Sequence, residues 1–309
     1  MRALFVSPHP DDIALSCGGL ILSLLSAEHE IDIVTLFSGC GAHERLTPYQ
    51  QLALGFGAQD RWVAEPSDRH ADPAEAGAAT AADAHAASHG PVPTPAEVMQ
   101  LRREEDRAYA RLLGVNIVHL DLPDAVFRDY VGDEQLLGAP RADDPTPVAE
   151  LRAVVRDLRP DRFNVPLGVG GHVDHRLARR ASMALVRGDD VDPTILRFYE
   201  DFPYAYNLGF SDPGQLDEEF REQVDGVPEV GRGEFEPLFV RIADFLDRKI
   251  DGLEAYPSQL GRLFGGEGPM ARAVREQAER LGKQVGLDAA ERYWRFAGRA
   301  DRIRAATSS

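Results

Sequence analysis

The stretch ALFVSPHPDD, residues 3–12, decides the fold. Its first part, Ala3–Ser7, is short and apolar and stops at Pro8, which predicts a buried strand. Residues 13–28 follow and predict a helix. In an open parallel sheet, the turn between such a strand and its helix lies at the carboxyl edge, where ligands bind.

Strands and helices keep alternating beyond this first unit. Further strands are predicted at Ile31–Phe37, Val115–Leu120, Arg162–Val165 and Ile195–Tyr199, and helices at Leu101–Leu113, Val148–Leu158 and 174–186. Because this alternation is typical of crossover units, we predict an α/β fold: a Rossmann-like, mostly parallel sheet with helices on both faces.

Two stretches interrupt the alternation. Residues 70–96 are rich in Ala and Pro and contain no Lys or Arg, which predicts a mobile insertion; the histidines His70, His85 and His89 leave a metal-binding lid as the alternative. Residues 208–237 predict a long surface loop, and Leu238–Ala255, Met270–Leu281 and Ala289–Ala305 are predicted as helices. We therefore expect a Rossmann-like domain over 1–206, with 207–309 forming a loop and helical C-terminal addition that packs on the same domain.

Composition excludes several classes of function. The 309 residues include 34 Lys and Arg against 51 Asp and Glu, a net charge of −17, whereas a nucleic-acid partner demands a basic excess. The uncharged run Ile13–Ala27 is too short to span a membrane and follows two aspartates, unlike a secretory signal. Cys17 and Cys40 are too few for a disulfide framework, so we expect a cytoplasmic protein.

A second polar motif, GGHVDH at 170–175, follows the strand Arg162–Val165 and opens the next helix. It should therefore lie at the same edge of the sheet as the first motif. His172 and His175 are three residues apart, which brings them to one face of a helix that starts there. Asp174 is placed to hold an imidazole by its second nitrogen.

The two motifs together predict a metal centre. Either one alone is more often a salt-bridged histidine, but together they offer two imidazoles and a carboxylate, the usual catalytic zinc set with an open fourth position. One carboxylate and one imidazole are then left over for catalysis. The ligand types suit Zn²⁺, and Fe²⁺ fits them equally well.

His-Pro-Asp-Asp after the first strand and Gly-His-x-Asp-His far downstream resemble the PIG-L (LmbE-like) family of zinc-dependent N-deacetylases. RREED at 102–106 and Leu122-Pro123-Asp124 extend the resemblance. It implies zinc on His9, Asp12 and His175. It further implies that Asp11 is the general base and that His172 is an oxyanion donor or general acid. Asp174 would orient a histidine, and Asp124 would contact the sugar.

The sequence departs from the family pattern at two places. Ile13 stands where an acid usually follows the second Asp, which removes a hydrogen bond but no ligand. Gly170 stands where some members carry a Tyr, so a second oxyanion donor has to come from elsewhere. Which group protonates the leaving amine, Asp11 or His172, stays open.

Other candidates are weighed against ordinary packing. Glu200 and Asp201 follow the fifth strand among aromatic residues, and we predict that they bind the substrate. Gly18-Gly19 lacks the G-x-G-x-x-G pattern of a dinucleotide site. Core packing is the preferred interpretation of the remaining polar and aromatic residues, namely Ser16, Cys17, Tyr256, Gln259, Tyr293 and Trp294.

The predicted function is metal-dependent hydrolysis of an N-acyl group, first of all N-acetyl, on a small-molecule amino sugar or glycoconjugate. One alternative is an amidase for thiol–sugar conjugates or acylated secondary metabolites. Another is a metal- or sugar-binding protein without turnover. The oligomeric state is left open.

Overall fold

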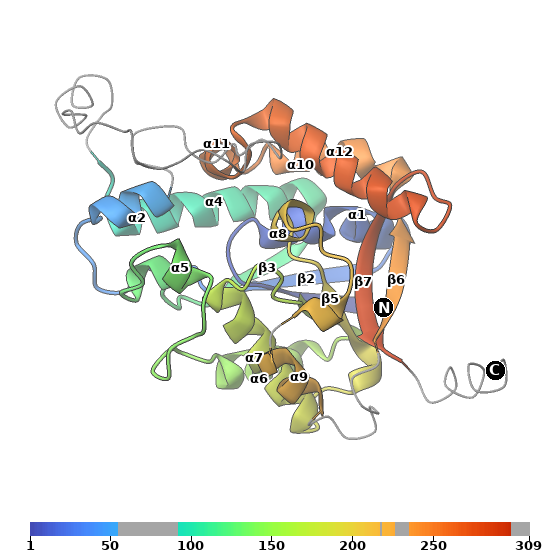
Figure 1. Ribbon diagram of the computed structural model, residues 1–309, viewed down its shortest axis with the longest axis horizontal. Helices are drawn as coiled ribbons and strands as arrows, with labels where there is room; N and C mark the ends of the chain where they lie inside the picture. The colour runs from blue at the N-terminus through green and yellow to red at the C-terminus, as the bar shows by residue number, and fades with distance from the viewer. Residues whose placement is uncertain (55–91, 217, 226–234, 298–309) are drawn as a thin grey trace.

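A computed structural model of the chain describes residues 1–54, 92–216, 218–225 and 235–297. Its centre is one seven-stranded sheet with the order β3-β2-β1-β4-β5-β7-β6 (Figure 1). The first five strands are parallel: β1 Arg2–Ser7, β2 Glu30–Thr35, β3 Asn116–His119, β4 Arg162–Pro166 and β5 Leu196–Tyr199. The predicted mostly parallel sheet is therefore confirmed.

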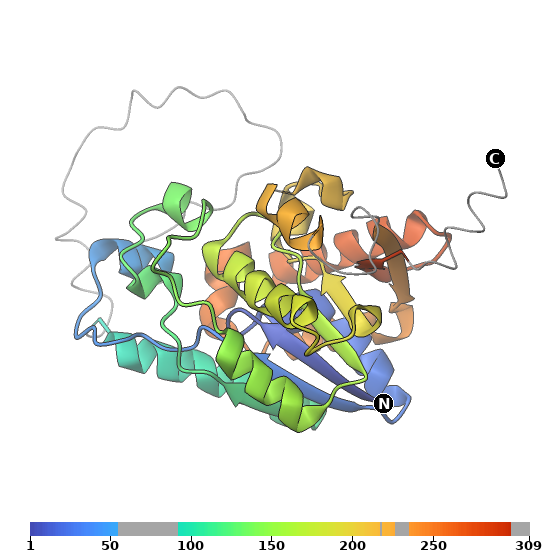
Figure 2. The same cartoon turned by 90° about the horizontal axis from the view of Figure 1, so that it is seen from below.

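Helices cover both faces of this sheet, as predicted. One face carries α1 (Asp12–Ser26) and α4 (Pro95–Leu113), and the other carries α6 (Val148–Leu158) and α7 (Val173–Arg187), as Figures 1 and 2 show. A further layer lies over α1 and α4 and consists of α10 (Leu246–Leu253), α11 (Pro257–Phe264) and α12 (Glu267–Lys283). The short helices are α2 Pro48–Ala53, α5 Asp133–Leu136, α8 Tyr204–Asn207 and α9 Glu218–Asp225.

Strand β1 shows why the sheet needs apolar side chains on both faces. Ala3 and Phe5 pack into the core under α1, whereas Leu4 and Val6 join the core on the α6–α7 side. All four are fully buried. Because alternate residues of a strand point to opposite faces, a strand covered on both sides must be a continuous apolar run.

The C-terminal part contains the predicted helical layer but also completes the sheet. Two antiparallel strands, β6 Phe235–Arg241 and β7 Ala290–Phe296, lie beyond β5. The prediction of helix over 289–305 is therefore wrong for its described part. The charged residues of β7 do not face solvent: Glu291 and Arg292 are buried in ion pairs with Lys249 and Glu200.

Three other boundaries differ from prediction. Helix α4 begins at Pro95 rather than Leu101, because Thr94 and Glu97 form a capping box at its start. The segment 238–255 is the end of β6 followed by α10, and α9 lies inside the predicted loop 208–237. Residues 70–91 of the predicted mobile insertion lie outside the described residues, and its last two residues, Pro95 and Ala96, belong to α4.

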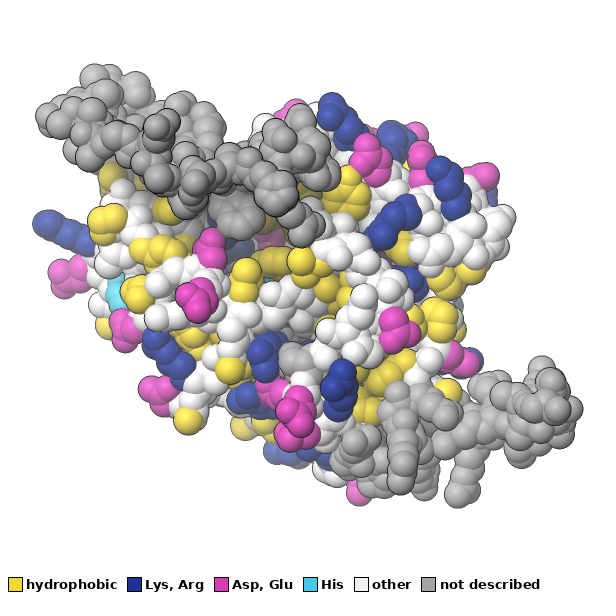
Figure 3. Space-filling view, viewed as in Figure 1, with side chains coloured by type: hydrophobic (Ala, Val, Ile, Leu, Met, Phe, Trp, Pro, Cys, Tyr) yellow, Lys and Arg dark blue, Asp and Glu magenta, His cyan; other side chains and the backbone are white. Residues whose placement is uncertain are grey.

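Both signs of charge occur on the described surface, and neither of the two cysteines forms a disulfide. Acidic and basic side chains are interspersed over the described part of the face in Figure 3. Cys17 is buried and Cys40 half-buried, and both are free thiols. Among the residues that the structure describes, none of the helices has the length and apolar character needed to cross a membrane.

Candidate active site

The two polar motifs meet where the strand order reverses. Strands β1 and β4 are neighbours and run parallel, so the turns after them leave the same edge of the sheet. Successive connections from β1 and β4 run to opposite sides at this point, which is where open α/β sheets bind ligands. The first motif follows β1 and the second motif precedes α7 after β4.

The turn after β1 holds its side chains by local hydrogen bonds. The Ser7 hydroxyl donates to the carbonyl of His9 at 2.6 Å, and the Asp12 carboxylate accepts from the His9 amide at 2.8 Å. Asp11 has a φ of 103°, a conformation that is rare for a residue other than glycine. Asp11 precedes α1, but its side chain makes no capping hydrogen bond to the helix. It lines the pocket instead.

Three buried side chains form a group that could hold a metal ion. The Asp12 Oδ2 lies 3.2 Å from His9 Nδ1 and 3.4 Å from His175 Nε2. The ligand atoms of the three residues all lie within 4.8 Å of one another. Two imidazoles and one carboxylate at these distances form a three-ligand set that leaves room for water or substrate.

Carboxylates behind the imidazoles fix their orientation. His9 Nε2 lies 2.9 Å from Asp174 Oδ2, and His175 Nδ1 lies 2.6 Å from Asp201 Oδ1. Asp201 is itself held by the amides of Gly168 and Val169, at 2.7 and 2.8 Å. In each imidazole the other nitrogen is the one turned toward Asp12, which is the arrangement that metal-binding histidines usually show.

A second group, His9, His172 and Asp174, is also compact enough for an ion. Its carboxylate is already occupied, because Asp174 accepts from Arg128, from the Ala125 amide and from His9. His172 Nδ1 accepts the Asp174 amide, so this nitrogen is occupied too. Because Asp174 and His172 already make these hydrogen bonds, the group of His9, Asp12 and His175 is favoured as the metal ligands.

The electrostatics of the group suit a cation. Burial opposes the charged form of His9, but Asp124, Asp12 and Asp174 raise its pKa well above the usual value. Burial likewise opposes charge on His175, whose pKa Asp12 and Asp201 nevertheless raise. The carboxylates therefore draw positive charge into this buried space, and the donor set fits a divalent ion.

Asp11 lies beside the ligands and next to a buried arginine. Arg102 Nη2 is 3.7 Å from Asp11 Oδ1, and Arg102 Nη1 is 3.3 Å from Asp124 Oδ2. Burial raises the pKa of Asp11 to about 7, although the Arg102 charge works in the opposite direction. A carboxylate with a pKa near neutrality can both accept and return a proton.

His172 is placed as a neutral donor. Burial, together with the positive charges of His9, His175 and Arg262, lowers the pKa of His172 well below its usual value. Its Nδ1 accepts the Asp174 amide at 3.2 Å, which assigns the proton of the neutral ring to Nε2. His172 lines the pocket, so it can offer this N–H to a substrate oxygen.

The pocket has about 530 Å³ of empty space, a volume that includes the open solvent at its mouth. Asp124 lines it near His9 and Arg102. Tyr204 forms another part of the wall, and a Cβ at Gly170 would lie 2.6 Å from its ring. Tyr204 therefore occupies the space beside Gly170. Helix α11 adds Gln259, Arg262 and Leu263 to the wall, and most of the other apolar lining comes from α2, α5 and the segment between β3 and α5.

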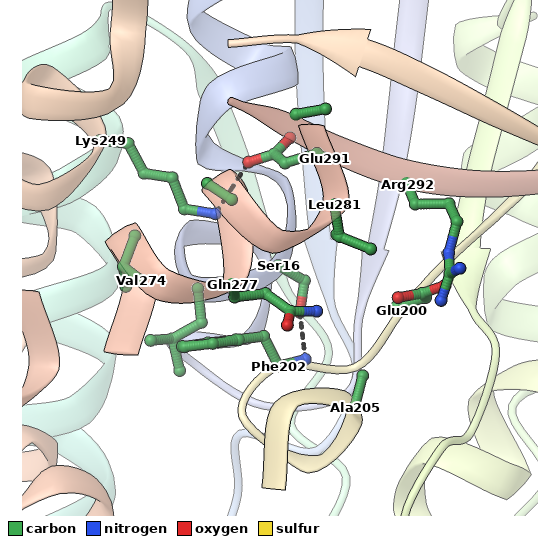
Figure 4. Close-up of a pocket in the computed structure, with 13 residues that line it drawn as sticks. Ser16, Glu200, Phe202, Ala205, Lys249, Val274, Gln277, Leu281, Glu291 and Arg292 are labelled. Atoms are coloured by element: carbon green, nitrogen blue, oxygen red, sulfur yellow. Dashed lines mark hydrogen bonds and ion pairs between the residues drawn. The ribbon is translucent and has the colours of Figure 1, made fainter. Parts of the chain in front are cut away.

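The structure separates Glu200 and Asp201 from this pocket. Asp201 is fully engaged behind His175, as described above. Glu200 accepts from Arg292 and from the Trp294 indole and borders a different, smaller cavity between α1, α12 and β7, shown in Figure 4. Neither is among the described residues that line the catalytic pocket, so the predicted substrate contacts find no support in these positions.

The fold and this site together define a class: a Rossmann-like α/β protein with a buried histidine–aspartate group that could hold a metal ion at the switch point of its sheet. The sequence model of the PIG-L family, GlcNAc-PI de-N-acetylase, matches residues 4–186. The chain therefore belongs to the PIG-L family, and the resemblance inferred from the two motifs is confirmed.

Similar proteins carry related names. A 2'-N-acetylparomamine deacetylase from Streptomyces fradiae is 31% identical over 264 residues, covering 84% of this chain and 73% of that protein. One from Niallia circulans is 28% identical, covering 65% and 66%. A zinc-inhibited form of teicoplanin deacetylase has the same fold, with a TM-score of 0.63, 19% identity and coverage of 95% and 97%.

Three polar residues of the pocket, Tyr204, Gln259 and Arg262, are not predicted as site residues from the sequence. Tyr204 lies in the segment after the fifth strand, where the predicted site residues are Glu200 and Asp201, and Gln259 is interpreted as a packing residue. Arg262 carried no signal, because a lone arginine in an amphipathic helix is usually solvated. Gly170 was the one signal in the sequence, because it lacks the Tyr side chain of some family members and another residue has to fill that part of the wall.

Proposed function

We propose that this protein is a divalent-metal-dependent N-deacetylase that hydrolyses the acetamide of an amino sugar or glycoconjugate. The observation that carries the proposal is the meeting of His9, Asp12 and His175 with Asp11 in one pocket. The names of two relatives, both 2'-N-acetylparomamine deacetylases, agree with this reaction.

The residues divide the chemistry among themselves. When bound to His9, Asp12 and His175, a divalent ion supplies Lewis acidity to the amide carbonyl and lowers the pKa of water. Asp11 takes the proton of the attacking water as general base. The Nε2–H of His172 donates to the oxygen on which negative charge develops, and such a donor is worth about 3–4 kcal/mol of barrier.

The leaving amine needs a proton, and Asp11 is the better source. The pKa of Asp11 is raised to about 7, so the protonated carboxyl is a competent acid after it has accepted the water proton. The pKa of His172 is lowered, so its ring holds no second proton to give. We therefore assign the proton return to Asp11 and oxyanion stabilisation to His172.

We propose zinc as the resident ion. Two imidazoles and a carboxylate whose ligand atoms lie within 4.8 Å of one another would suit it, and iron(II) is the competing choice. Elemental analysis of protein purified without added metal decides between them. A predominance of iron would overturn the assignment of zinc without affecting the assignment of the ligands.

Acetate release from a panel of N-acetylated amino sugars, thiol–sugar conjugates and acylated secondary metabolites tests the activity. The Asp11→Ala variant should lose about 10²–10⁴-fold in rate, because it lacks the general base, while it retains the metal content of the wild type. An unchanged rate would show that Asp11 is not the base. Metal binding without any acetate release across the panel would favour the non-catalytic alternative.

A further inference from the structure

Helix α11 forms a wall of the catalytic pocket although it lies far outside the matched family segment, residues 4–186. It comes from the layer that covers α1 and α4 (Figure 1). Gln259 is buried and Arg262 exposed, and both line the pocket. The residues proposed to act on the acetamide thus lie within the segment that matches the family model, whereas this wall comes from a part of the chain that follows that segment.

Arg262 differs from the other charged groups of the pocket. The carboxylate of Asp12 faces two imidazoles, and those of Asp11 and Asp124 face Arg102. Within the part of the chain that the structure describes, the Arg262 guanidinium makes no hydrogen bond or ion pair. It therefore lies unpaired among these residues, at the exposed side of the pocket.

Helix α11 is fixed to α4 at its first turn. The Ser258 amide and hydroxyl donate to Glu105 Oε1 and Oε2, at 2.9 and 2.6 Å. The Tyr256 hydroxyl donates to Asp106 Oδ1 at 2.8 Å. The buried carboxylates satisfy the start of the helix, and Arg262 follows Ser258 by about one turn. Its backbone is therefore held in place over the pocket.

We propose that Arg262 is a specificity-determining residue that reads the part of the substrate beyond the N-acetylated sugar. Its guanidinium favours hydroxyl or carboxylate oxygens at that position and disfavours a protonated amine. The inference rests on the proposed deacetylation and deepens it, because it names the chemistry of the group that the enzyme accepts next to the sugar.

The test uses two glycosides of N-acetylglucosamine that differ in one group, a 2-hydroxyethyl and a 2-aminoethyl aglycone. We expect the wild type to have the higher kcat/KM for the hydroxyethyl glycoside. Arg262→Glu should shift the ratio of the two kcat/KM values by about tenfold or more toward the amine, because the sign of the nearby charge is reversed. The same reversal at exposed Arg272 of α12, which does not line the pocket, should leave the ratio unchanged.

The dissociation constants of the same two glycosides, measured by calorimetry, separate the two hypotheses. If Arg262→Glu changes the ratio of the two dissociation constants but neither glycoside releases acetate, the proposed function is overturned and the role of Arg262 is supported. A ratio equal to that of the wild type overturns the role of Arg262, whether or not acetate is released. Absence of both binding and release overturns both.

The contact with α4 adds a second readout. Glu105→Gln weakens the hold on Ser258, and we expect KM for the hydroxyethyl glycoside to rise several-fold while kcat stays near that of the wild type. Glu104→Gln, at the exposed neighbouring position, is the matched control. An equal loss of kcat and metal binding in Glu105→Gln would indicate general damage to the fold and contradict a positioning role.

Discussion

At the scale of single residues, the centre depends on carboxylates that never touch the substrate pocket. Asp174 and Asp201 are fully buried, and each contacts the outer nitrogen of one imidazole. They determine which nitrogen faces Asp12, and they raise the basicity of the ring. Residues of this kind cannot be separated from substrate contacts by sequence alone, since both follow a strand at the ligand-binding edge.

Asp201→Asn should weaken metal binding about 10–100-fold, because the amide cannot accept from His175 and from the two backbone amides in the same way. Competition with a chromophoric chelator measures the affinity. Asp157→Asn, on the exposed face of α6, is the control and should bind metal as the wild type does. Wild-type affinity in Asp201→Asn would contradict the orienting role.

Tyr204 is a candidate for the donor that Gly170 cannot supply. Burial raises the pKa of Tyr204 well above its usual value, so the hydroxyl stays protonated at neutral pH. Tyr204→Phe should lower kcat about 10²–10³-fold, because it removes a hydroxyl that we expect to donate to the oxyanion, and should leave metal affinity unchanged. Tyr206→Phe on the same helix removes a hydroxyl that donates to Glu276 and is the matched control. Equal kcat values for both variants would contradict this role.

At the scale of elements, the Gly18-Gly19 pair shows how a motif can have a packing function. A Cβ at Gly19 would lie 2.6 Å from Ile242 and 2.8 Å from the Glu291 carboxylate. Glu291 accepts from the amides of Gly19 and Leu20 and from Lys249, each at 2.8 Å. The glycine lets α1 approach β7 closely, which joins the first helix of the chain to its last strand.

Gly19→Ala should therefore reduce the free energy of unfolding by about 1–3 kcal/mol through overpacking. Urea denaturation measures the change. Gly268→Ala in α12 is the control, because a Cβ there meets no atom within 4 Å and should be neutral or stabilising by up to about 1 kcal/mol. Equal stability of the two variants would contradict the close approach of α1 and β7.

The success of prediction also varied by element. Residues 3–7, 31–37 and 162–165 could be predicted as strands because they are short, largely apolar and alternate with helical segments, as strands buried on both faces do. Strand β7 was missed because Glu291 and Arg292 carry their charges into the core, where Lys249 of α10 and Glu200, directly after β5, neutralise them. Such pairing depends on tertiary contacts, and it has no local signature in the sequence.

At the scale of the whole molecule, the metal group links distant parts of the chain. His9 and Asp12 lie at the start and His175 follows β4, while Asp201 supports His175 from beyond β5. Sequence reasoning predicted the meeting of the motifs, because parallel strands leave one edge of a sheet. It could not predict the wall from α11, because no periodicity in the C-terminal third indicates which helix reaches back over the pocket.

An ion that binds this group in the folded state, and not in the unfolded chain, must stabilise the entire fold. At a free concentration 100 times its dissociation constant, the gain is about 2.7 kcal/mol, so chelation should lower Tm measurably and added zinc should restore it. Asp12→Ala removes the ligand that both imidazoles face, and its Tm should respond to neither treatment. Because the argument requires ligands from both motifs, a zinc-dependent Tm that persists in Asp12→Ala would place the stabilising ion elsewhere in the chain.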